Sequence, residues 1–129
     1  MTNLRNARNR TRLCLLALLT AGLAGCGPSP APPPDAARGK TLYATNGCAA
    51  CHGAAGRGDG TLGKTLTPHP TDFTASTFGT GQNVEEIARI IQSGRAADPT
   101  PMPAYDYLPE ADRRDMAAFV LSLAEAPAP

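Results

Sequence analysis

Apolar side chains recur with the period of an α-helix in three stretches of the chain. In the last stretch they fall at i, i+3, i+4 and i+7, at Met116, Phe119, Val120 and Leu123. Pro109 suits the first turn of this helix, because proline lacks the amide hydrogen that a first turn leaves unpaired. Glu110 and Asp112 follow it, where the helix dipole favours acidic side chains. The pattern predicts a helix from about residue 109 with one apolar face.

Two earlier stretches carry signals for the start and end of a helix. Asp35 is a suitable N-cap for a helix that an Asn-Gly pair ends eleven residues later. Asn83 is a suitable N-cap for a second helix, with Glu86 as its capping-box partner and Gly94 at its end. The inner face of this second helix would consist of Ile87, Ile90 and Ile91. No segment alternates clearly enough to predict a strand, so we expect an all-α fold with three or more helices.

Glycine and proline dominate the segments between the expected helices. Residues 53–81 contain seven glycines and two prolines, and residues 98–103 read DPTPMP. Loops this long are unusual in a small domain unless they serve a function. The chain also has no Trp, three Phe and three Tyr, which is a small supply of bulky core side chains. We therefore expect these loops to wrap around a planar, apolar cofactor.

The beginning of the chain has the features of a bacterial export signal. Four arginines precede an apolar run that ends at Leu23-Ala24-Gly25-Cys26, a pattern that resembles a lipobox. We predict a lipoprotein signal peptide over residues 1–25 and lipid attachment at Cys26. The proline-rich residues 26–34 would form an extended tether. The folded domain would then span residues 35–125, followed by a short tail, residues 126–129.

Charge argues against one large class of partners. Without residues 1–25, the 12 Lys and Arg fall to 8 against 11 Asp and Glu, which gives a formal net charge of −3. A mildly acidic domain without a basic patch is not suited to neutralising phosphates, so no nucleic-acid partner is expected.

The sequence CAACHG at residues 48–53 is the strongest chemical signal in the chain. A redox CxxC would require a preceding strand, whereas this pair follows an expected helix. A zinc site would require two further ligands, and the remaining histidines are His52 and His69, the first directly adjacent to Cys51. A C-x-x-C-H motif instead attaches haem through both cysteines and binds its iron through the histidine. The motif thus predicts attachment by Cys48 and Cys51 and iron ligation by His52.

At this point the chain resembles the class I, mitochondrial-type, cytochromes c of bacteria. The resemblance lies in GKTLYATNGCAACHGAAGRGDG, TPMPAY and the closing MAAFVLSL, and it covers roughly residues 36–124. It implies the cytochrome c fold around one covalently bound haem c, with Gly39 where the first and last helices cross. It also implies that Met102 is the sixth iron ligand and that a proline carbonyl, of Pro68 or Pro70, accepts the His52 Nδ1 hydrogen. His69 is a rival ligand, although its place between two prolines favours the surface.

Iron with both axial positions filled exchanges electrons and offers no open site to a substrate. We therefore expect a non-enzymatic one-electron carrier that is a monomer and makes brief contact with redox partner proteins. It would be exported to the periplasmic side and attached to a bacterial membrane by its lipid. Two alternatives remain: a haem subunit of a larger dehydrogenase or oxidase complex, and a gas-binding haem protein in which Met102 is displaced.

Overall fold

A computed structural model describes residues 30–75, 78 and 82–125. The predicted signal peptide, Cys26 and the predicted tail lie outside the described residues. The chain divides after Pro32 into two units, and all the elements described here belong to the second, residues 33–129. Among the described residues, no helix is both long enough and apolar enough to cross a membrane.

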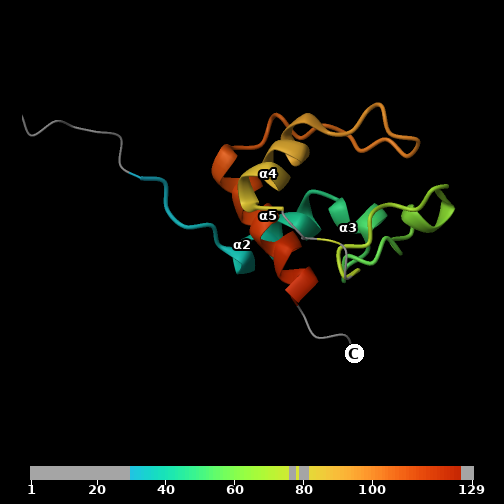
Figure 1. Ribbon diagram of the computed structural model, residues 1–129, viewed down its shortest axis with the longest axis horizontal. Helices are drawn as coiled ribbons and strands as arrows, with labels where there is room; N and C mark the ends of the chain where they lie inside the picture. Colours follow the sequence, from blue (N-terminus) through green and yellow to red (C-terminus); the bar gives the residue numbers. More distant parts are fainter. Residues whose placement is uncertain (1–29, 76–77, 79–81, 126–129) are drawn as a thin grey trace, which may run out of the picture. The chain divides into compact units, whose positions relative to one another are not determined.

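The second unit is built from helices, as the sequence predicts. In chain order they are α2 (Ala36–Thr45), α3 (Cys48–His52), a 3-10 helix η1 (Gly63–Thr65), α4 (Val84–Ser93) and α5 (Glu110–Glu125) (Figure 1). Within the described ranges there is no strand, and the only β-type pairing is an isolated bridge between Arg95 and Met102. The predicted all-α fold is therefore confirmed.

The helix caps are the ones that the sequence indicates. The Asp35 carboxylate accepts hydrogen bonds from the amides of Ala37 and Arg38, at 2.9 and 3.1 Å. The Asn83 side chain accepts one from the amide of Glu86 at 2.9 Å. These bonds satisfy amides that the first turn of a helix leaves without partners, and so fix where α2 and α4 begin.

Helix α5 is the centre of the packing, because both α2 and α4 pack against it (Figure 1). A Cβ atom at Gly39 would lie 1.9 Å from the Asp115 carbonyl oxygen, so α2 can approach α5 this closely only without a side chain there. Tyr43 and Phe119 meet edge to face across this contact, with ring centroids 5.2 Å apart. The helix crossing predicted at Gly39 is thus present.

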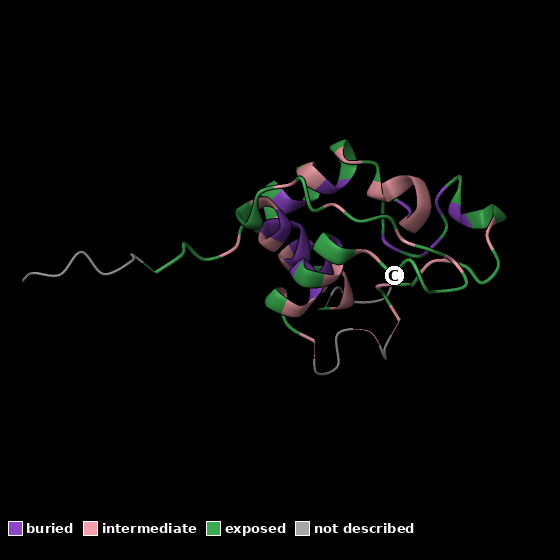
Figure 2. Ribbon diagram, turned by 90° about the horizontal axis from the view of Figure 1, so that it is seen from above, coloured by how far each residue is buried: buried purple, intermediate pink, exposed green. Residues whose placement is uncertain are grey.

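The buried core lies along the inner faces of these three helices (Figure 2). It consists of Tyr43, Ile87, Ala88, Ile91, Met116, Ala117, Phe119 and Val120. Leu123, predicted to share the apolar face of α5, is partly buried against this core. The core is small and leaves the inner side of α4 and α5 facing a cavity.

A charged network joins the start of α2 to α5. Arg38 forms ion pairs with Asp112 and Asp115, and the Asp35 amide donates to the Asp115 carboxylate at 2.8 Å. Partial removal from water opposes ionisation of Asp115, but the hydrogen bonds from Asp35 and Arg38 outweigh it and lower the pKa of Asp115. The network stabilises the crossing of α2 and α5.

Candidate functional site

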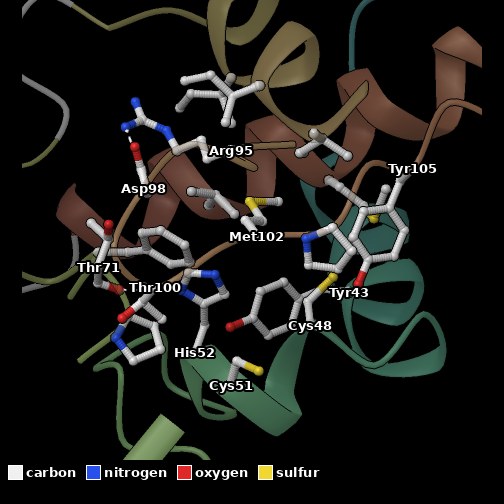
Figure 3. A pocket seen from close by; sticks show the side chains of 18 of the residues that line it. Tyr43, Cys48, Cys51, His52, Thr71, Arg95, Asp98, Thr100, Met102 and Tyr105 are labelled. Atoms are coloured by element: carbon white, nitrogen blue, oxygen red, sulfur yellow. Dashed lines mark hydrogen bonds and ion pairs between the residues drawn. The ribbon is translucent and has the colours of Figure 1, made fainter. Parts of the chain in front are cut away.

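One cavity contains all four residues that the sequence predicts to hold a cofactor. Cys48, Cys51 and His52 line it from α3, and Met102 lines it from the loop after α4 (Figure 3). Much of the remaining wall is apolar, with Leu66, Phe73, Phe78, Ile87, Ile90, Ile91, Met116 and Val120. The fold therefore brings Met102 to the same apolar space as a motif fifty residues before it.

The cysteine motif lies on a single helical turn. Gly47 precedes this turn with a left-handed φ of 79°, which glycine adopts without strain. The following loop, residues 53–62, folds back over α3, and three of its amides donate to α3 carbonyls. These bonds run from Gly58 to His52 at 2.8 Å, from Gly60 to Cys51 at 3.2 Å and from Leu62 to Ala50 at 2.8 Å. Backbone hydrogen bonds from the following loop thus hold the motif in place.

Gly60 in this loop and Gly63 at the start of η1 are needed for this close backbone packing. A Cβ at Gly60 would lie 2.3 Å from the Ala50 carbonyl oxygen, and one at Gly63 would lie 2.0 Å from that of Cys51. Real Cβ atoms do not approach this closely, so a side chain at either position would push the loop away from α3. The glycines after the motif therefore position the cysteines as well as forming a loop.

His52 is oriented by the loop of residues 66–75, here called the proximal loop. Its Nδ1 lies 3.3 Å from the Thr71 carbonyl oxygen, and its ring stacks on Phe73 with centroids 4.5 Å apart. Burial lowers the pKa of His52, and the Thr71 carbonyl only partly opposes this, so the imidazole is favoured in its neutral form. A neutral imidazole whose Nδ1 is engaged has Nε2 available for a metal.

The carbonyl beside His52 differs from the one expected. The sequence predicts Pro68 or Pro70, but the structure places the Thr71 carbonyl there. The Pro68 carbonyl instead accepts a hydrogen bond from the Thr100 hydroxyl. The Pro70 carbonyl packs over Gly58, where a Cβ would lie 2.4 Å from it. Both proline carbonyls therefore serve other contacts, and the expectation was wrong by at least one residue.

The surroundings of Cys48 differ from those of a reactive redox cysteine. Cys48 and Cys51 are both free. Burial raises the pKa of Cys48 to about 11, with Cys51 adding to the effect and a backbone hydrogen bond opposing it. Cys48 is therefore a thiol at neutral pH, whereas a reactive CxxC cysteine has a lowered pKa.

Met102 lies in an irregular loop, residues 94–105, here called the distal loop. The backbone holds this loop in two ways. Met102 and Arg95, near its two ends, exchange hydrogen bonds of 2.9 and 3.3 Å, and the Tyr105 amide donates to the Ile91 carbonyl of α4 at 3.0 Å. Gly94, with a φ of 65°, lies close to the backbone of Met102. A Cβ at Gly94 would lie 2.6 Å from the Met102 carbonyl oxygen. The end of α4 thus decides where Met102 lies.

Residues 36–124, most of the chain, match the sequence profile of cytochrome c. The chain belongs to the cytochrome c family. One similar solved structure is the reducing HAO-like protein complex Kustc0457/Kustc0458 of Kuenenia stuttgartiensis, at 29% sequence identity and a TM-score of 0.57. The match covers 71% of this chain and 44% of that one, so this chain corresponds to less than half of its solved relative. No match was found among curated proteins.

The residues of this cytochrome c fit the haem c that the family binds. Both cysteines and His52 are on one turn facing an apolar cavity, which suits covalent attachment along one edge and ligation at the centre. No group of three or more His, Cys, Asp or Glu side chains within the described ranges could hold another metal ion. The donor set therefore favours haem over zinc.

His69, the rival ligand, and Met116, the other methionine among the described residues, have different positions. His69 is exposed, does not line the cavity, and has Nδ1 3.1 Å from the Gly63 carbonyl oxygen. Met116 does line the cavity, but it is 1% exposed and belongs to the core face of α5, as predicted. Met102 differs from both, because it lines the cavity and lies in an irregular loop.

Sequence reasoning missed two residues that shape the site. The buried Tyr43 hydroxyl donates to the Gly53 carbonyl at 2.8 Å, which fixes the end of α3. Burial is the main cause of the raised pKa of Tyr43, so its hydroxyl remains a donor. Thr71 acts through its backbone, and no side-chain pattern could have indicated it. The spacing of Tyr43 from Cys48 carried no signal either, because Asn46 and Gly47 end α2 between them.

Proposed function

We propose that this cytochrome c is a class I, one-electron carrier with one haem c. Cys48 and Cys51 would hold the haem covalently, and His52 and Met102 would be its axial ligands. The observation that carries the proposal is that these four side chains line one apolar cavity (Figure 3). The chemistry that the bound group supplies is the reversible uptake of one electron at its iron.

In this function the protein would hold the two axial ligands in place and shield the haem site from water. The Thr71 carbonyl and the Phe73 ring fix the orientation of the His52 imidazole. The bridge to Arg95 holds the Met102 backbone. The apolar wall from α4 and α5 keeps water away, which limits reorganisation when the charge of the site changes. With both axial positions taken by protein, no position is left for a substrate, so we infer a carrier and not an enzyme.

A second candidate function is a haem subunit of a larger oxidoreductase assembly. The observation that favours it is the similarity to a chain of a structure described as a protein complex. The iron site would be the same, but the partner would be permanent. Co-purification of the native protein at high salt distinguishes the two, because a diffusing carrier separates from its partners and a subunit does not.

We propose that the domain functions outside the cytoplasm, on the periplasmic side of a bacterial membrane. The support is the arginine-rich, apolar start of the chain and the lipobox-like sequence that ends at Cys26. The proline-rich segment that follows would separate the domain from a lipid at Cys26. The domain would work as a monomer that contacts redox partner proteins, with no nucleic acid.

Two measurements on the purified full-length product test the proposal together. A reduced pyridine haemochrome spectrum reports whether haem is bound through thioethers, and the intact mass reports the number of haems and acyl chains. We expect two thioethers, one haem, loss of residues 1–25 and added acyl chains. A protein expressed with the haem-attachment machinery that carries no covalent haem would contradict the proposed function. A haem-loaded protein without acyl chains would contradict only the lipid anchor.

A further inference from the structure

One hydrogen bond joins the two loops that flank the proposed haem site. The Thr100 hydroxyl, two residues before Met102, donates to the Pro68 carbonyl oxygen. Pro68 lies three residues before Thr71, whose carbonyl faces His52 Nδ1. The bond therefore connects the distal loop, which carries Met102, to the proximal loop, which orients His52. Thr100 and Thr71 both line the cavity (Figure 3).

The bond differs in kind from the other contacts that hold the distal loop. The exchange between Arg95 and Met102 joins two parts of the distal loop through their backbones, and the bond from the Tyr105 amide to the Ile91 carbonyl attaches the loop to α4. The ion pair of Arg95 with Asp98 lies within the loop itself. Among the described residues, the Thr100 hydroxyl makes the only hydrogen bond between the distal and proximal loops. It can therefore be removed by changing one side chain.

Prolines stiffen both ends of this bond. Pro101 follows Thr100 directly, Pro103 follows Met102, and the acceptor is itself a proline with Pro70 two residues later. Proline fixes φ and restricts the residue before it, so neither end can adjust freely around a lost contact. A bond between two stiff segments transmits displacement from one to the other, whereas a bond between two flexible segments would not.

We propose that Thr100 is a positioning residue that couples the two axial ligands. Its hydroxyl, through the Pro68 carbonyl, holds the distal loop against the proximal loop and so limits how far Met102 can move from the iron. The inference rests on the proposed function, since it assumes Met102 as the ligand. Loss of the hydroxyl leaves haem attachment and the α4 contacts in place, but it allows an external ligand to displace Met102 more readily.

The direct test is an imidazole titration of the oxidised holo-protein in three forms: wild type, Thr100→Val and Thr100→Ser. Valine has the shape of threonine without the hydroxyl, and serine keeps the hydroxyl. One neutral hydrogen bond contributes roughly 1 kcal/mol, so Thr100→Val should bind imidazole about 3- to 10-fold more tightly. Thr100→Ser should stay within about 2-fold of wild type. Thr45→Val is a matched control, because it removes a threonine hydroxyl bond within α2.

A second measurement tests the coupling between loops. Hydrogen exchange of the reduced holo-protein should be faster in Thr100→Val at the Met102 amide, bonded to Arg95, and at the Phe73 amide, bonded to Gly56. Faster exchange at Met102 alone would overturn the coupling, because Thr100 would then act only on its own loop. If Thr100→Val yields no holo-protein, Thr100→Ala provides the same comparison without a branched side chain.

The outcomes separate this inference from the proposed function. Unchanged imidazole affinity in Thr100→Val overturns the role of Thr100 and leaves Met102 as the ligand. If Met102→Ala binds imidazole with the same affinity as wild type, Met102 ligation itself is contradicted, whatever the result for Thr100.

Discussion

The two sides of the cavity are held in different ways. The His52 side is local: α3, the glycine loop over it and the proximal loop all lie within residues 47–75, and several short backbone bonds connect them. The Met102 side depends on the end of α4, through Gly94 and Arg95. The comparison suggests that attachment and sixth-ligand binding can be damaged separately. Changes on the first side should remove the haem, and changes on the second should leave it attached with a poorer ligand.

The largest effect should come from the glycines that pack against α3 on the His52 side. In Gly63→Ala the new Cβ would meet the Cys51 carbonyl oxygen at 2.0 Å, with the Gly58 carbonyl oxygen also near. We expect a loss of about 3 kcal/mol or more in stability and little attached haem, measured by haemochrome content per mole of protein. Gly47→Ala is the control. It has open space but a φ of 79°, so it should cost only about 1 kcal/mol. Equal losses in both variants would mean that the close packing is unimportant.

Gly94→Ala tests the other side of the comparison. The Cβ would lie 2.6 Å from the Met102 carbonyl oxygen, and a φ of 65° disfavours alanine. We expect the haem to remain attached while the long-wavelength iron–sulfur absorption band of the oxidised protein is lost or strongly reduced. A variant that loses its haem, or that keeps the full band, would show that the two sides are not independent in this way.

A smaller effect is expected when one hydrogen bond is removed beneath α3. Tyr43→Phe leaves the buried Gly53 carbonyl without its partner at 2.8 Å. The cost should be about 1–2 kcal/mol, or a melting temperature lower by roughly 4–16 °C for a domain of this size. The iron–sulfur band should be unchanged, because the bond lies on the His52 side. Tyr107→Phe is the control. Tyr107 is 70% exposed, so the loss of its hydroxyl should leave the melting temperature unchanged.

The smallest effect concerns the scaffold that both sides share. The pKa of Asp115 is lowered in the folded state, so its contribution to stability is present above the unfolded value of about 4 and is lost as the pH falls through the folded value. Asp115→Asn should therefore be less stable than wild type at neutral pH, and the difference should shrink below about pH 4. Denaturant unfolding of both proteins, at neutral pH and below about pH 4, measures this difference in stability. A difference that stays constant with pH would show that the charge of Asp115 is unimportant.

Local signals predicted much of this molecule. The caps at Asp35 and Asn83, the apolar face of α5 and the crossing at Gly39 depend on residues close together in the chain or on one small side chain. The motif at residues 48–52 predicted cofactor chemistry, but its helical form and the loop packed on it were not expected. They depend on tertiary backbone bonds, which have no side-chain signature.

The error at the proximal carbonyl has the same origin. The resemblance to cytochromes c implies a proline carbonyl, of Pro68 or Pro70, but any residue has a carbonyl, and the path of the loop determines which one reaches His52. That path depends on contacts such as those of Gly58 with Pro70 and of Thr100 with Pro68. A residue's backbone role in an irregular loop cannot be read from its identity.

The most direct test of the central claim is the long-wavelength absorption band of the oxidised holo-protein in wild type, Met102→Ala and His69→Ala. If Met102 is the sixth ligand, the band is present in wild type and His69→Ala and absent from Met102→Ala, with the haem still attached in all three. A band that survives in Met102→Ala, or that wild type lacks, would contradict the claim.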